Sequence, residues 1–307
     1  MTEYLNKVYE VKKNFDKLVQ NTDLEIIKIY EEATMEVSKK MQKYSKTSST
    51  YKFHKQVLRE LEKMRYDLKL KLKLVYEQSL NNASSLGEKN TLLALEQVFK
   101  GTNLKVEQHL KNKFFAISNE TVKQMVAGKY YNDELTLDDR IWQLTKENVK
   151  RIDKLIQINI AKGANARELQ KVLDRFARPE KRLINHKPLL DKMYKNYSYQ
   201  ARRLARTSLT HAYSESLKRT AAANPFCLGI RWNVSLAHET RQVKRYGPDV
   251  CTEYNNKVYE FNKVPIQHPN CMCFFTQEIQ DIKKSREELI SWIKGEKNPK
   301  LDNLIDR

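Results

Sequence analysis

The stretch YKFHKQVLRELEKMRYDLKLKLKLVYEQSL, residues 51–80, decides the fold class because it contains neither glycine nor proline and alternates apolar and charged side chains at helical spacing. Both residue types are absent from Met1 to Leu86, so no residue there forces a helix to stop. Apolar residues of the first segment recur at steps of three and four, as on one helical face: Tyr4, Val8, Val11, Phe15 and Leu18. A second such run begins near Asp23, and the polar cluster SKTSST (residues 45–50) is expected to be a loop. The sequence predicts antiparallel helices or a long helical arm.

Capping signals divide the chain more clearly after Gly101. Thr136, followed by two aspartates, is expected to precede a helix that ends at Gly163. Asn165, with Glu168 three residues later, has the pattern of a capping box that starts another helix. The basic connector RPEKRLINHKP, residues 178–188, is predicted to be a domain boundary.

The last third of the chain mixes helix and strand. A helix with a stripe of small side chains is expected over residues 198–223, and GIRWNV (229–234) is typical of a strand. Further extended pieces are expected near 258–261 and a helix over 285–294. We predict a mainly α fold of long helices with a small α+β, Cys/His metal-stapled C-terminal module. The predicted domains are an extended basic helical region (1–100), a helical middle domain (101–180), the module itself (190–280), and a C-terminal helix and tail (281–307).

The charge of the chain suggests a class of partner. Lysine and arginine number 57 against 38 acidic residues, a formal net charge of +19. Such an excess repels itself and favours a polyanionic partner, most commonly nucleic acid. A lysine-rich composition also follows from an AT-rich genome, and a single charge run is usually a solvated helix face.

No apolar run reaches the roughly 18–20 residues that a membrane-spanning helix needs, and the N-terminus lacks the apolar core of a signal peptide, so we expect a cytoplasmic protein.

All four cysteines lie in the last third of the chain, three of them within a dense cluster of ligand-type residues. Thiolate and imidazole groups together suit a structural zinc ion with four tetrahedral ligands. The predicted ligands are Cys251, His268, Cys271 and Cys273, with His238 and Asp249 as additional ligands or as partners of a ligand imidazole. Two alternatives stay open: reduced cysteines buried in a small core, and a disulfide from Cys251. Cys227, between Phe226 and Leu228, is expected to be a core residue.

A loop-rich module with little apolar core is expected to gain much of its folding free energy from the ion. Enzymatic readings fit less well, because glycine-rich phosphate loops are absent and a Cys251–His268 nucleophile pair lacks a recognisable oxyanion hole. A zinc deaminase needs a glutamate two residues after its ligand histidine, whereas Glu239 follows His238 directly. A metal-dependent nuclease or toxin-like effector using the same cluster, with His238, Glu239 and Asp249, remains the alternative.

Several motifs, in this order, resemble the C-terminal domain of phage minor head proteins, also called head morphogenesis proteins, the broader Mu F-like group. They are ARRLARTSLTHAYSES (201–216), NPFCLGIRWNVS (224–235), His238, DVCTEY (249–254) and VYEFNKVPIQHPNCMC (258–273). Upstream, GKYYNDELTLDDRIW (128–142) and IAKGANARELQKVL (160–173) are similar to the middle region of the family. The basic stretch ETRQVKRYGP (239–248) departs from the family pattern as an insert.

The resemblance implies a non-enzymatic virion component, present in few copies near the portal vertex and acting in procapsid assembly. Implied partners are the portal protein, the scaffold or major capsid protein, and double-stranded DNA. It implies a location in the virion head, and in the host cytoplasm during assembly. Cys251, His268, Cys271 and Cys273 match the family-pattern positions, with Asp249 and His238 as weaker matches. The arginines Arg202, Arg203 and Arg206 are the candidate contacts for DNA or a partner protein.

Overall fold

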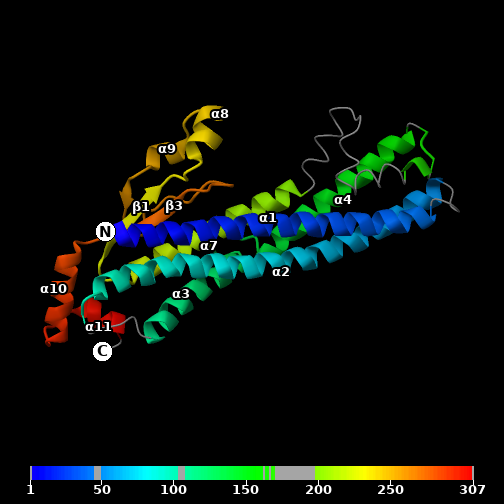
Figure 1. Cartoon of the computed structure of the whole chain (residues 1–307). Coiled ribbons are helices and arrows are strands. Elements are labelled where there is room, and N and C mark those ends of the chain that lie inside the picture. Colours follow the sequence, from blue (N-terminus) through cyan, green and yellow to red (C-terminus); the bar gives the residue numbers. More distant parts are fainter. Residues whose placement is uncertain are drawn as a thin grey trace. The chain divides into compact units, whose positions relative to one another are not determined.

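The computed structural model describes residues 2–44, 50–102, 108–161, 163–165, 167–169 and 198–305 (Figure 1). Its long helices are α1 (Thr2–Tyr44), α2 (Thr50–Phe99), α3 (Gln108–Val126), α4 (Leu137–Ala161) and α7 (Tyr199–Ala222). The C-terminal part contains β1 (Cys227–Asn233), the π-helical turn η2 (Glu239–Val243), α8 (Lys244–Tyr246), α9 (Val250–Tyr254), β2 (Val258–Tyr259), β3 (Phe274–Ile279), α10 (Ile282–Ile293) and α11 (Pro299–Ile305). The predicted fold class, mainly α with a small α+β C-terminal part, is confirmed.

The first two helices are longer than the sequence pattern predicts. The runs expected before and after Asp23 form one helix, α1, and the helix expected to end near Leu80 continues to Phe99. Four residues of the predicted N-terminal stripe (Tyr4, Val8, Val11 and Phe15) are at most 2% exposed, whereas Leu18 is half-buried. Most of the predicted loop SKTSST lies outside the described residues, and its last residue, Thr50, begins α2.

Gly87 explains why α2 continues through a residue that usually weakens helices. A Cβ atom at this position would lie 2.2 Å from the backbone oxygen of Tyr213 in α7. Only glycine therefore allows the two helices to approach this closely. Two side-chain contacts join the same helices: Asn90 Nδ2 donates to the Tyr213 hydroxyl (2.8 Å), and the hydroxyls of Thr91 and Thr220 are 2.7 Å apart.

The chain divides into two compact units, one of Met1–Gln20, Gln78–Met125 and Arg206–Arg307 and one of Asn21–Glu77 and Val126–Ala205. Each unit combines segments from more than one of the predicted domains. The predicted division into domains stays a prediction. The connector 178–188 lies outside the described residues. None of the helices in the described ranges is long and apolar enough to span a membrane.

In the second unit, the predicted caps are present. Thr136 and Asp139 exchange hydrogen bonds at the start of α4, from Thr136 N to Asp139 Oδ2 and from Asp139 N to Thr136 Oγ1, both 3.1 Å. Asn165 and Glu168 form the second predicted capping pair in the same way. Within this unit, Asn148 of α4 donates from Nδ2 to the Tyr30 hydroxyl of α1 (2.8 Å).

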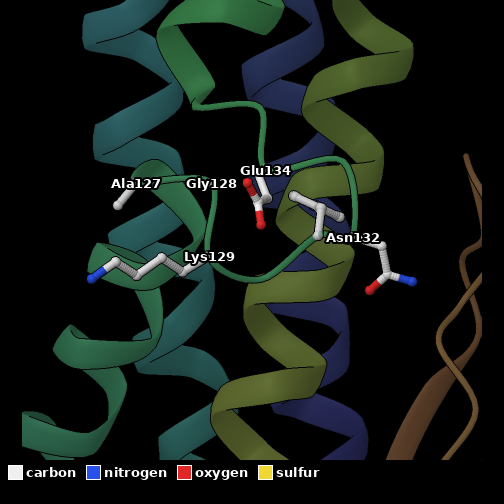
Figure 2. A pocket seen from close by; sticks show the side chains of 6 residues that line it. Ala127, Gly128, Lys129, Asn132 and Glu134 are labelled. Carbon is white, nitrogen blue, oxygen red and sulfur yellow. The ribbon is translucent and has the colours of Figure 1, made fainter.

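A surface hollow lies in the loop between α3 and α4 (Figure 2). Gly128, with φ +79°, allows the chain to turn back so that its Cα lies against the Glu134 carbonyl. The side chains of Lys129 and Asn132 point away from each other (Figure 2), so the polar groups of this loop do not converge on a common point.

The C-terminal sheet has the strand order β2-β1-β3, with both pairs antiparallel. Trp232 of β1 is paired with Phe275 of β3, and its ring centroid lies 5.0 Å from that of Phe275 and 5.1 Å from that of Tyr254. These aromatic side chains pack with Leu217 and Ile230 in a core that also contains the cysteines. The expectation of a module with little apolar core is therefore wrong, because aromatic residues far apart in the sequence bury one another.

We predict that Gly87→Ala destabilises the protein although alanine favours helix formation by about 1 kcal/mol. The added methyl group would meet backbone atoms of α7, which cannot rotate away, and overpacking of this kind costs about 1–3 kcal/mol. Urea denaturation followed by circular dichroism measures the change. Ser85→Ala, on the exposed face of the same helix, is the control and should change stability by less than about 0.5 kcal/mol. A Gly87→Ala protein more stable than the parent would contradict this helix contact.

Candidate metal centre

Cys251 is positioned by the short helix α9. Asp249 is its N-cap: the Thr252 amide donates to Asp249 Oδ1, and the Asp249 amide donates to Thr252 Oγ1, both at 3.2 Å. This reciprocal cap starts the helix at Val250 and directs the next side chain inward. Cys251 is 1% exposed as a result.

Helix α7 holds the turn that carries the other two cysteines. Thr210 Oγ1 donates to the Cys271 carbonyl (3.0 Å), and His211 Nε2 donates to the Gln267 carbonyl (2.8 Å). The Asn270 amide donates to Thr207 Oγ1 (2.9 Å), with Asn270 itself in the left-handed region at φ 63°. These contacts fix the backbone of the HPNCMC turn from one side. These residues lie in the motif ARRLARTSLTHAYSES (201–216), but their contacts with the turn do not follow from the sequence, because they depend on which segment packs against the helix.

The turn is also closed from within. The Cys271 amide donates to the His268 carbonyl (3.1 Å), and the buried Gln267 side chain donates from Nε2 to the Cys273 carbonyl (2.6 Å). Cys271 and Cys273 are 2% and 3% exposed. Their thiols thus face the same buried space as the thiol of Cys251.

The three thiols form a compact cluster. The Sγ atoms of Cys251, Cys271 and Cys273 all lie within 4.8 Å of one another, and those of Cys251 and Cys271 are 3.7 Å apart. Two sulfurs bound to one tetrahedral zinc at about 2.3 Å are about 3.8 Å apart, so this spacing fits an ion. A disulfide would bring two sulfurs to about 2.05 Å, and all four cysteines are free thiols.

The charges of the cluster also favour a cation. Hydrogen bonds from Cys251 and Cys271 lower the pKa of Cys273, whereas the hydrogen bond with Cys271 raises the pKa of Cys251. Three thiolates buried together would repel one another strongly, and a divalent cation removes that repulsion as it displaces the protons.

Asp249, Cys251 and His268 form a second group of ligand-type atoms within 4.8 Å of one another, so Cys251 belongs to both groups. The Asp249 carboxylate lies between two histidines: Oδ1 is 3.4 Å from His238 Nε2, and Oδ2 is 3.6 Å from His268 Nε2. The His268 side chain is 41% exposed and can rotate about its own bonds. His268 and Asp249 are therefore the candidates for a fourth ligand.

His238 lies beside Asp249 and is not in either group of ligand-type atoms found in the described residues. Its Nε2 atom lies 2.9 Å from Thr252 Oγ1 as well as beside Asp249. A histidine in this place orients the carboxylate and the start of α9, which is the role of a partner behind a ligand. Glu239, the third residue of the nuclease alternative, is exposed on the π-helical turn.

Cys227 belongs to the apolar core, as the sequence predicts. It is 9% exposed, its thiol donates to the Gly229 carbonyl (3.2 Å), and burial raises its pKa to about 12. It is not a member of either group of ligand-type atoms found in the described residues. Cys227 is thus a protonated structural cysteine.

The three candidate contact arginines lie on α7 with unequal exposure. Arg203 is exposed, whereas Arg202 and Arg206 are half-buried. Arg206 Nη1 lies 3.4 Å from Asn270 Oδ1, so this side chain also touches the metal-site turn. Contact of these residues with DNA or a partner protein stays a prediction.

Comparison with protein-family models, with curated proteins and with solved structures gives no match. The resemblance to phage minor head proteins therefore rests on the motifs themselves. Three of the C-terminal motifs come together in space: the α7 segment 206–216 contacts the HPNCMC turn, and DVCTEY supplies Cys251 to the same cluster. These three motifs form one structural site.

We predict that the purified protein contains about one zinc ion per chain and that Cys251→Ser or Cys271→Ser removes it. Each change deletes one of three thiolate ligands. Elemental analysis by mass spectrometry after gel filtration gives the metal content. Cys227→Ser is the matched control, since it replaces a buried thiol outside the cluster and should leave the metal content unchanged.

Cys271→Ser and His268→Ala should also make the C-terminal module susceptible to proteolysis, because each removes a proposed metal ligand. The N-terminal helices should stay protected in both variants. Limited proteolysis followed by mass spectrometry locates the cuts. An unchanged C-terminal fragment in both variants, or equal zinc loss in Cys227→Ser, would refute the proposed ligand set.

Proposed function

We propose that this chain is a minor structural component of a tailed-phage head that acts in procapsid assembly at or near the portal. The observation that carries the proposal is the convergence of three C-terminal resemblance motifs (201–216, 249–254 and 258–273) on one buried site formed by Cys251, Cys271 and Cys273. A chance likeness of separate short segments would not require that they contact one another. The contacts between these motifs in the folded chain thus support the proposal.

The role proposed for the metal site is structural, with zinc as the ion. Cys251, Cys271 and Cys273 would hold it, with His268 or Asp249 as the fourth ligand. Zinc supplies a cross-link between α9 and the turn before β3. The thiols are at most 3% exposed, and this seclusion from solvent suits a closed structural site better than a catalytic site with an open position.

The proposed mode of action is docking. Long helices offer extended surfaces to the portal, scaffold or major capsid protein, and the net charge of +19 favours contact with packaged double-stranded DNA. Contacts with the phosphate backbone position a protein without reading sequence, so any packaged genome would serve. This proposal needs no catalytic residue.

Mass spectrometry of purified phage heads tests the proposal. We expect this chain to co-purify with the portal protein at a small fraction of the copy number of the major capsid protein, because the resemblance is to a low-copy component at the portal vertex. Tail fibres purified from the same lysate serve as the control preparation. Heads that contain portal protein but none of this chain would contradict the proposal.

A metal-dependent nuclease is the second candidate, favoured by one observation: the Asp249 carboxylate lies between His238 and His268 beside Cys251. Histidine and carboxylate ligands suit a hydrolytic metal. We expect no cleavage of supercoiled plasmid by the purified protein with Mg²⁺, Mn²⁺ or Zn²⁺. Metal-stimulated cutting that is lost in both His238→Ala and Asp249→Asn would establish the nuclease instead.

A further inference from the structure

The segment Glu239–Tyr246, which we call the basic finger, has no role in the metal site described above. It consists of the π-helical turn η2 and the short helix α8, and none of its side chains is buried. Figure 1 shows α8 at the outer end of its region, away from strands β1 and β3. π-Helical turns are rare and recur at functional sites.

Both ends of the finger are fixed at the metal site. His238, directly before it, contacts Asp249, and Asp249 caps the helix that carries Cys251. The finger ends at Gly247, where φ is +86°, and Gln242 Nε2 donates to the Gly247 carbonyl (3.2 Å). The finger thus has a fixed base and an exposed surface.

The cations of the finger have no acidic partner in the part of the chain that the structure describes. Arg241, Lys244 and Arg245 are exposed, and none forms an ion pair with a carboxylate of the residues that the structure describes. By contrast, Lys218 of α7 is paired with Glu215 at 2.5 Å. The finger contains one acidic residue, Glu239, so its cations outnumber its carboxylates.

A large aromatic side chain is exposed beside these cations. Tyr246 is 78% exposed, and Leu236, just before the finger, is 89% exposed. Exposed rings next to lysine and arginine are the composition of surfaces that bind single-stranded nucleic acid, where cations contact phosphates and rings stack on bases. An acidic protein surface would form ion pairs with the cations, but it would offer the Tyr246 ring no planar base to stack on.

We propose that the basic finger binds nucleic acid, with Arg241, Lys244 and Arg245 contacting phosphates and Tyr246 stacking on an unpaired base. This inference goes beyond the proposed function, whose nucleic acid is packaged double-stranded DNA, and does not rest on it. The metal site fixes the base of the finger and thereby limits the positions that its cations sample. Binding would be independent of sequence and sensitive to salt.

Fluorescence anisotropy with the full-length protein tests the proposal, using a labelled oligothymidylate and a labelled duplex of equal length at several KCl concentrations. The triple variant Arg241→Ala, Lys244→Ala, Arg245→Ala should bind oligothymidylate at least about tenfold more weakly. Its salt dependence (the slope of log K against log[KCl]) should fall by about two, since each lost phosphate contact on a single strand removes about 0.7. Unchanged zinc content verifies that the variant is folded.

The matched control removes the same charge elsewhere in the same compact unit. Lys283→Ala, Lys284→Ala, Lys297→Ala changes three exposed lysines of the α10–α11 region and should alter affinity less than about twofold. Equal losses in the two triple variants would overturn the proposal, because the effect would then follow net charge alone. Wild-type affinity and salt slope in the finger variant would overturn it as well.

Tyr246→Ala should weaken oligothymidylate binding by about fivefold or more while changing duplex binding little, and Tyr246→Phe should retain wild-type affinity.

Binding of the wild type to phosphatidylglycerol vesicles but to neither oligonucleotide would replace nucleic acid with a membrane surface and overturn the proposal. These assays need no capsid component. Failure of the finger is therefore distinguishable from absence of the chain in phage heads.

Discussion

Three thiols that come from two separate segments share one buried space, and the C-terminal part of this protein is arranged around that constraint. Cys251 enters from α9, and Cys271 and Cys273 enter from the turn before β3. Three thiolates buried this close together would repel one another, and a cation would remove that repulsion. Because the finger leaves and re-enters the fold beside this cluster, anything that loosens the thiols also loosens the base of the finger.

Helix α7 connects the cluster to the helical part of the first compact unit. Its Thr210 and His211 hold the cysteine-bearing turn. Less than one helical turn further along, Tyr213 accepts a hydrogen bond from Asn90 and lies against Gly87. Polar side chains in these contacts are almost completely buried, and each has a specific partner. Such pairs fix the register of packed helices more strictly than apolar contacts do.

Helical periodicity and caps could be read from the sequence because they are local. The N-terminal stripe, the Thr136 cap and the Cys/His cluster all follow from spacing alone. Strand β3 was not predicted: five of its six residues are buried, so it shows none of the alternation that marks a half-exposed strand. The apolar core of the module was also underestimated, because Trp232, Tyr254 and Phe275 meet only through the tertiary fold. A glycine at position 87 is typical of a helix end in the sequence. In the structure it lies inside α2, where its missing side chain allows α7 to pack closely.

X-ray absorption spectroscopy at the zinc edge tests the central claim most directly, since it reports the ligand atoms of the ion in the native protein. The account predicts three sulfur ligands at about 2.3 Å and one nitrogen or oxygen ligand at about 2.0–2.2 Å. A protein free of metal, or an ion surrounded only by nitrogen and oxygen, would contradict the role assigned to Cys251, Cys271 and Cys273.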